Sequence, residues 1–284
     1  MEVSSPASTV SQGDAVVERW NRQERWQHGL LALSTAVLII TGFAIKYRHT
    51  FWAPGVVAAF GGFRNLFYAH LTAAVLLFIS IAYHLVYLVC NYRPRRDGWP
   101  MMPTWQDVRD CIHHLKYLAG LEKERPHFGR YTYLEKFEYW AVGWGIVIMG
   151  ISGLVLWFPE IAGRWFPYWV IEAFRVAHSN EAFVCFFAVA VGHFFAAHFA
   201  PGVFPMSTVW LDGKISLERL KEEHPAEYEE LVKRPDFKPQ PAQGRVVRWQ
   251  RRWAENPVLL FVELIPYLGI VIWSLATFVP LLLS

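Results

Sequence analysis

Histidine is the residue type in this 284-residue sequence whose placement points most directly to chemistry. Six of the eleven histidines fall within or at the ends of long apolar stretches: His28, His70, His84, His178, His193 and His198. An ionisable side chain in hydrocarbon costs free energy unless it is paired or coordinated, so these histidines are functional candidates. One of them could serve as a hydrogen bond between helices, but six need a common explanation.

Two pairs of these histidines recur at a similar spacing. His70 and His84 are 14 residues apart. His178 and His193 are 15 residues apart. An α-helix turns by about 100° per residue, so the second histidine of the 14-residue pair lies at about −40° from the first, and that of the 15-residue pair at about +60°. Each pair therefore keeps broadly to one helix face. Each pair covers roughly 21–22 Å of helix, which fits within a hydrocarbon core of roughly 30 Å.

The two segments that carry these pairs are expected to run in the same direction across the membrane. His70 then faces His178 near the outer side, and His84 faces His193 near the inner side. Imidazole is a common axial ligand of haem iron, and a helical bundle can enclose the porphyrin. Facing imidazoles at two depths therefore predict two stacked haem b groups with histidine as the iron ligand.

His28 and His198 are surplus in this scheme, since His198 lies about 140° around the helix from His193. His28 could replace His84 as the partner of His193. Alternatively, the surplus histidines could line a quinone site or contact haem propionates. A third haem held by His28 and His198 is a further, less favoured alternative.

A haem-free membrane anchor, or a transporter that relays protons or metal ions, is the alternative interpretation of the same histidines. Such transporters usually add Asp or Glu within the spans. The acidic candidates here, Glu181 and Glu263, are expected near span ends. Scarce carboxylates within the spans favour haem over proton relay.

Charged residues are strongly segregated along the chain. The 27 basic and 24 acidic side chains all lie outside five stretches, 26–45, 65–92, 139–159, 182–211 and 264–284. A run of about 18 or more apolar residues can cross the hydrocarbon core. The sequence therefore predicts five spans, at 28–46, 66–90, 138–158, 178–200 and 258–282. This pattern excludes a soluble enzyme, a disordered protein and, despite the net charge of +3, a nucleic-acid-binding module.

The basic residues in the loops suggest how the chain is oriented in the membrane. Twenty-two of the 27 basic residues lie before the first span or in the loops after the second and fourth spans. The positive-inside rule then places the N-terminus in the cytoplasm and the C-terminus outside. The N-terminal segment lacks the basic and apolar regions of a signal peptide, so the first span is expected to be retained.

These spans divide the chain into four predicted parts. They are a cytoplasmic tail at 1–21, mobile over 1–18, a four-helix haem-binding bundle at 22–204, a cytoplasmic loop at 205–256 and a fifth transmembrane helix at 257–284. The fold class is therefore all-α and integral to the membrane. The loop 205–255 fits a solvated segment and a cap over the inner face about equally well.

An amphipathic helix is expected in the loop between spans two and three. Thr104 and Asp107 have the spacing of a capping box, and apolar residues then recur at helical spacing. The segment 104–119 is predicted to lie on the inner membrane surface or against a partner. The three cysteines, Cys90, Cys111 and Cys185, form no C-x-x-C pair, which argues against a structural zinc site and an attached c-type haem.

Small and basic residues near the spans allow further roles. Gly143, Gly145, Gly150 and Gly153 permit close helix packing or clearance for a porphyrin edge. Arg64, Arg130 and Arg175 flank the spans, where they could anchor the helices or pair with haem propionates.

Several segments resemble a known family. The opening RWQHGLLALSTAVLIITG is similar to the R-x-x-H…T-G start of the membrane cytochrome b subunits of formate dehydrogenase and nickel–iron hydrogenase. RNLFYAHLTAAVLLFISIAYHLVYL, RYTYLEKFEYWAVGWGIVIMGISGLVLWFPE and HSNEAFVCFFAVAVGHFFAAHFAPGVFPMS resemble the formate dehydrogenase cytochrome b (gamma) group. The resemblance covers roughly residues 22–230 and leaves out the fifth span, a possible docking helix.

The resemblance implies a dihaem anchor in a prokaryotic plasma (inner) membrane. The anchor would pass electrons between a peripheral redox subunit, an iron–sulfur or multihaem protein, and menaquinone or ubiquinone. The resemblance implies no catalytic residue in this chain. Matched by position, the haem ligands are His28, His70, His178 and His193. His84 has no counterpart among the family's ligands, and the spacing of the two span-four histidines is one residue longer than in the family. For the partner of His193 at the inner haem, the resemblance therefore favours His28, whereas the spacing within span two favours His84. His198 and Asn180 are candidate contacts for the quinone or a haem edge.

Overall fold

The structure, a computed structural model, describes residues 15–92, 99–199, 203–204, 206–242 and 257–283. It confirms the all-α membrane architecture, because four described helices are long and apolar enough to cross a bilayer. Three are the continuous helices α1 (Arg22–Lys46), α3 (Phe63–Tyr92) and α5 (Tyr133–Trp157). The fourth is α7 (Tyr168–Phe187), which continues through a π-helical turn, η2 (Ala188–His193), into α8 (Phe194–His198).

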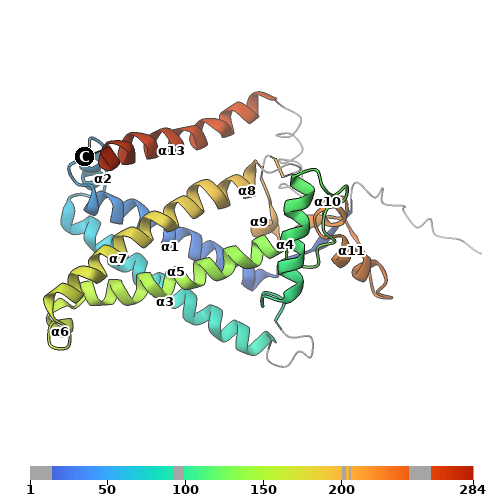
Figure 1. Cartoon of the computed structure of the whole chain (residues 1–284), viewed down its shortest axis with the longest axis horizontal. Helices are drawn as coiled ribbons and strands as arrows, with labels where there is room; N and C mark the ends of the chain where they lie inside the picture. Colours follow the sequence, from blue (N-terminus) through green and yellow to red (C-terminus); the bar gives the residue numbers. More distant parts are fainter. Residues whose placement is uncertain (1–14, 93–98, 200–202, 205, 243–256, 284) are drawn as a thin grey trace, which may run out of the picture.

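The four spans alternate in direction and form two hairpins, in which α1 packs against α3 and α5 packs against α7 (Figure 1). The short helices α2 (Ala53–Ala59) and α6 (Pro159–Ala162) lie at one end of the bundle, here called the outer end. The opposite end, which carries the described N-terminal residues, is here called the inner end.

A further apolar helix, α13 (Pro257–Leu283), packs along the bundle in the place of the fifth expected span. Its Phe278 is buried against Phe43 of α1 and Phe186 of α7. Trp52 after α1 donates a hydrogen bond from Nε1 to Thr277 Oγ1 at 3.1 Å. Burial of large aromatic rings is a strong source of packing energy, so α13 is held to the outer half of the bundle by an aromatic cluster.

The fourth span begins earlier than expected, at Tyr168 and not at residue 178. The charges of Glu172 and Arg175 concealed its first turns, but these side chains form an exposed ion pair of 3.2 Å near the end of the helix. As a result Glu181, expected near a span end, lies near the middle of the helix Tyr168–His198. The scarcity of carboxylates inside the spans is therefore less complete than the sequence suggested.

Capping residues fix where the spans begin at the inner end. Asn21 accepts hydrogen bonds from the N–H groups of Gln23 and Glu24, and the Glu24 carboxylate accepts from Asn21 N–H. Thr132 and Glu135 form the same reciprocal arrangement at the start of α5. Each box satisfies backbone donors that a helix start leaves without partners.

The inner end carries a small α/β unit, here called the inner cap. A three-stranded antiparallel sheet has the order β2 (Lys214–Ser216), β1 (Ala15–Glu18), β3 (Gln240–Pro241). Val16 pairs with Ser216 on one side and with Gln240 on the other. The helices α9 (Val209–Asp212), α10 (Leu217–Glu223) and α11 (Pro225–Val232) complete it.

The inner cap corrects one expectation and decides another. Ala15–Glu18 is the central strand and not part of a mobile tail, since its buried side chains pack with Ile215 and Leu220; residues 1–14 lie outside the described part. The described residues 206–242 form a folded cap and not a solvated loop, and 243–256 lie outside the described residues.

The predicted amphipathic helix is confirmed as α4 (Trp105–Leu118), which runs across the inner ends of the spans (Figure 1). The backbone N–H and hydroxyl of Thr104 donate to Asp107 at 2.6 and 2.8 Å, as the capping-box pattern predicts. Lys136 of α5 donates to the same carboxylate at 2.8 Å. Although burial alone would raise it, these hydrogen bonds hold the pKa of Asp107 below its ordinary value.

Candidate functional site

The outer histidine pair begins with His70 of α3, whose ring is fixed by a neighbouring helix. Its Nδ1 lies 2.9 Å from the hydroxyl of Thr41, a fully buried residue of α1. The Thr41 hydroxyl also donates to the carbonyl of Val37, one turn earlier, at 2.6 Å. The α1–α3 hairpin therefore supplies both the ring and the group that orients it.

The second hairpin repeats this arrangement with different residues. Nδ1 of His178 on α7 lies 3.0 Å from the hydroxyl of Ser152, which is buried on α5. That hydroxyl donates to the carbonyl of Ile148 at 2.6 Å. His70 and His178 are close enough to interact electrostatically, so the two hairpins bring two similarly held imidazoles toward one another.

These hydrogen bonds define the tautomer of both rings. A hydroxyl has one proton, and in each case that proton is donated to a carbonyl of the same helix, so the oxygen accepts from the histidine Nδ1–H. A neutral imidazole with its proton on Nδ1 presents the Nε2 lone pair to a metal. His70 and His178 could therefore hold a metal through Nε2.

A glycine lies under each of the two rings. A Cβ at Gly42 would be 3.2 Å from Cε1 of His70, and a Cβ at Gly153 would be 3.3 Å from Cε1 of His178. Both distances are tighter than ordinary carbon contacts, so a larger residue would displace the ring. Gly153, expected to pack a helix or clear a porphyrin edge, packs on a histidine, while Gly145 packs on Glu181 and Gly150 on Phe78.

The inner pair consists of His28 and His193, whose ring centroids are 6.2 Å apart. An imidazole nitrogen binds a metal ion at about 2 Å, so two imidazoles on opposite sides of one ion have ring centres about 6 Å apart. Nδ1 of His28 is buried without a hydrogen-bond partner among the described residues. Trp20 and Trp210 lie 5.3 and 5.9 Å from the His28 ring. The distance between the His28 and His193 rings and the aromatic surroundings of His28 fit two histidines that share one iron.

His193 differs from the outer ligands in its supporting group and its backbone. Its Nδ1 lies 3.4 Å from the carboxylate of Glu138 on α5, and both side chains are about half exposed. It ends the π-helical turn η2. Because a π-turn takes up about one residue more than an α-turn, the 15-residue separation from His178 behaves as about 14 residues of regular helix. The longer spacing noted in the sequence is therefore absorbed locally.

His84, the alternative inner ligand, is engaged elsewhere. Its Nδ1 lies 2.6 Å from Oε1 of Gln27, and its Nε2 lies 2.6 Å from the hydroxyl of Tyr139. The ring thus bridges α1, α3 and α5 with both nitrogens in hydrogen bonds. The structure brings His28 to His193 and holds His84 in a polar bridge.

The remaining candidates lie outside the two pairs. His198 stacks on Phe194 with ring centroids 4.2 Å apart, at the end of α8. Asn180 is exposed on α7. Arg64 is exposed and Arg175 pairs with Glu172, while Arg130 belongs to an ion network described next.

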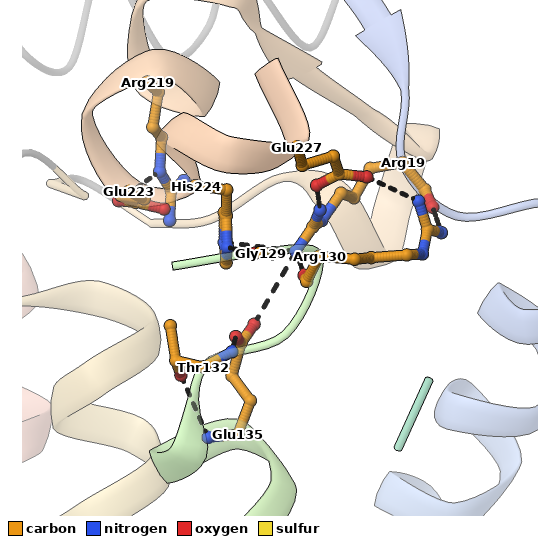
Figure 2. Close-up of polar contacts among 9 residues, drawn as sticks. All are labelled: Arg19, Gly129, Arg130, Thr132, Glu135, Arg219, Glu223, His224 and Glu227. Atoms are coloured by element: carbon orange, nitrogen blue, oxygen red, sulfur yellow. Dashed lines mark hydrogen bonds and ion pairs between the residues drawn. The ribbon is translucent and has the colours of Figure 1, made fainter. Parts of the chain in front are cut away.

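A buried ion network lies between the inner cap and the start of α5 (Figure 2). Figure 2 shows Glu227 between Arg19 and Arg130: Arg19 donates to one carboxylate oxygen, and Arg130 donates to the other at 2.8 Å. The side chains of Arg19 and Glu227 are 5% and 9% exposed. Buried charges are costly unless paired and hydrogen-bonded, so this network specifies how the cap is joined to the bundle.

His224 completes the network as a neutral side chain. Its Nδ1 donates to the carbonyl of Gly129 at 2.8 Å, and its Nε2 lies 3.1 Å from the guanidinium of Arg19. Burial, followed by the positive charge of Arg19, lowers the pKa of His224 to about 4. The neutral ring can accept from Arg19, which a protonated ring could not.

Sequence reasoning missed the residues that orient the ligands, namely Thr41, Ser152 and Glu138. A signal for the first two is present, because a hydroxyl residue followed by glycine occurs in both α1 and α5, as Thr41–Gly42 and Ser152–Gly153. No comparable signal marks Glu138, which reaches His193 only through the packing of α5 on α7 and its continuation.

Known proteins resemble this chain in the same region. The sequence model of the family described as prokaryotic cytochrome b561 matches residues 19–210. The chain is 24% identical over 132 residues to the cytochrome b556(Fdn) subunit of the nitrate-inducible formate dehydrogenase of Escherichia coli (strain K12), which covers 46% of this chain and 58% of that subunit. It is 30% identical over 132 residues to the cytochrome b556(fdo) subunit of formate dehydrogenase from the same strain, which covers 46% and 60%.

A longer alignment relates the chain to a formate dehydrogenase cytochrome b556 subunit of Haemophilus influenzae, with 22% identity over 219 residues. It covers 77% of this chain and 85% of that subunit. The chain spans slightly less than two thirds of the length of the Escherichia coli relatives.

Proposed function

Because the chain belongs to the prokaryotic cytochrome b561 family, and is thus a multi-pass membrane protein that binds haem b, we propose that it is the electron-transferring subunit of a respiratory oxidoreductase complex. Its relatives are named as subunits of formate dehydrogenases. The proposed partners are a peripheral redox subunit, iron–sulfur or multihaem in kind, and a membrane quinone. We propose no substrate chemistry for this chain itself.

The proposed cofactors are two haem b groups at two depths. The outer group would be held by His70 and His178, and the inner group by His28 and His193. His84 is proposed as a structural bridge, since both of its nitrogens are hydrogen-bonded. When bound, haem b supplies reversible one-electron chemistry at its iron.

The protein's own contribution is to orient the histidine rings and to surround them with apolar side chains. Thr41 and Ser152 would hold a proton at Nδ1 of the outer histidines and so leave the lone pair on Nε2. Glu138 does the same for His193 with a charged acceptor. At the outer pair the two hydroxyls are fully buried among apolar helices, and the low local dielectric strengthens their polar contacts.

The proposed orientation has the inner end in the cytoplasm and the C-terminal end of α13 outside. The support is the excess of basic residues in the loops at the inner end. Electrons would then pass between a partner at the outer face and a quinone, menaquinone or ubiquinone, near the cytoplasmic face. His198, at the inner end of α8, is the candidate quinone contact.

The observation that carries this proposal is the repeated hydroxyl–histidine–glycine unit in two different hairpins. A reduced-minus-oxidised spectrum of the purified chain, with a haem count, tests it. The expected result is the spectrum of bis-histidine haem b with about two haems per chain. A colourless protein would contradict the proposal and would favour a haem-free anchor or transporter, for which the mid-span position of Glu181 is the relevant observation.

A further inference from the structure

The helix α4 presents a surface that the proposed electron transfer does not use. It crosses the inner ends of the spans instead of running along them (Figure 1). One side is fixed to α5, where Lys136 binds Asp107 and where the rings of His114 and Tyr133 lie 5.9 Å apart. The rest of the helix surface faces away from the bundle, so its composition reports on an external environment.

An apolar stripe follows the exposed side of α4. Residues at spacings of three and four recur along it and are 44–78% exposed: Trp105, Val108, Ile112, Leu115 and Leu118. Large exposed apolar surfaces mark sites of contact with a membrane or a partner. Trp140, which is 41% exposed near the start of the spanning helix α5, donates from Nε1 to the carbonyl of Met101 at 2.9 Å, four residues before the stripe begins. The stripe therefore begins near a spanning helix, and this position favours the bilayer as the occupant.

A basic stripe runs beside the apolar one. Arg109, His113 and Lys116 lie at i, i+4 and i+7, on one face of the helix. Together with Ile112 and Glu122 they line a shallow pocket of about 280 Å³. Ile112 belongs to both features, so the pocket opens at the boundary between apolar and charged surface. Phospholipids have the same boundary between acyl chain and phosphate.

We propose that α4 is an interfacial helix that binds an anionic phospholipid of the leaflet at the inner end. The phosphate would lie against Arg109 and Lys116, and the acyl chains would follow Ile112 and the apolar stripe. Helices with an apolar face bordered by Lys and Arg lie in the membrane interface, where anionic lipids add attraction. This inference goes beyond the proposed electron transfer and needs only the membrane location of the spans.

The test uses delipidated full-length haem-loaded protein in detergent, titrated with phosphatidylglycerol or phosphatidylcholine and measured by native mass spectrometry. The double variant Arg109→Gln/Lys116→Gln is expected to bind phosphatidylglycerol about 30-fold more weakly, at about fivefold for each basic residue. Its matched control is Lys233→Gln/Lys238→Gln, which removes the same charge from exposed positions near α11 and should bind as the unaltered protein does.

Three results would overturn the proposal. They are equal affinity of the two double variants, no preference for phosphatidylglycerol over phosphatidylcholine, and full displacement of the lipid by inorganic phosphate, which would indicate a site for a soluble anion. A second measurement follows quenching of Trp105 by brominated lipid in nanodiscs, against a Trp105→Phe control. Absent quenching would mean that the stripe does not lie in the bilayer, and it would overturn the proposal in favour of a protein partner. The haem spectrum of each sample separates these outcomes from a failure of the proposed function.

Discussion

The outer and inner histidine pairs are held by different chemistry. His70 and His178 are oriented by buried neutral hydroxyls that belong to the adjacent helix of their own hairpin. His193 is oriented by the carboxylate of Glu138, and His28 lies against Trp20 and Trp210, which come from opposite ends of the matched region.

This difference follows the depth of each pair. A charge in the hydrocarbon core is expensive, so hydroxyls that share a proton with their own helix suit the outer pair. The inner pair lies next to the inner cap and its ion network, where charges can be paired. The outer site is therefore encoded within spans, and the inner site depends on segments brought together from across the chain.

Removing a proposed outer ligand should have the largest effect. His70→Ala is expected to lose one of the two proposed haems, since one axial histidine and its hydroxyl contact cannot hold the group alone, while the inner haem stays. A haem count per chain measures this. His49→Ala, at an exposed loop position, is the matched control, and an unchanged haem count in His70→Ala would refute the outer assignment.

Removing the shared carboxylate of the inner cap should destabilise the inner region alone. Glu227→Gln leaves Arg130 without its ionic partner and leaves the buried Arg19 with only the longer contact to Glu135 at 4.0 Å, which costs roughly 3–5 kcal/mol. Faster amide exchange in α10 and α11, with α1 and α3 unchanged, is the expected result. Glu230→Gln on the exposed side of α11 is the control; similar exchange in both variants would mean that the network contributes little.

The cap should also lose stability in acid. The pKa of His224 is lowered from 6.5 to about 4 in the folded protein, so between these values the unfolded chain binds a proton that the folded chain does not. The free energy of unfolding of the cap is highest above pH about 6.5, and it falls by up to about 3 kcal/mol as the pH falls to about 4. Exchange pulses at one fixed pH, after incubation at different pH values, measure it. His224→Gln should flatten the dependence; an equally steep response would assign it to another group.

The smallest expected effect is a change in redox potential that distinguishes the carboxylate of Glu138 from the hydroxyl of Ser152. Glu138→Gln removes a negative charge and a strong acceptor from His193, the proposed inner ligand, so the ferric state should be stabilised less and the inner potential should rise by about 50 mV. Ser152→Ala should leave the inner potential unchanged, since Ser152 contacts His178. Potentiometric titration measures both, and a fall or no change in Glu138→Gln would contradict the role of the carboxylate.

The same contrast explains how much the sequence could predict. The spans were found because charge-free runs mark lipid exposure, and helix direction was enough to propose the pairing of His70 with His178. The choice between His28 and His84 depends on the rotation of α1 against α3, which periodicity does not contain. The strand Ala15–Glu18 was missed because its partners lie about 200 residues away, and the early start of α7 was hidden by Glu172 and Arg175.

The most direct test of the central claim is the haem stoichiometry of two inner variants, His28→Ala and His84→Ala, purified side by side. If His28 and His193 share the inner iron, His28→Ala keeps one haem per chain and His84→Ala keeps two, although its bridge to Gln27 and Tyr139 is lost. The opposite pattern, with two haems in His28→Ala and one in His84→Ala, would contradict the assignment of the inner site.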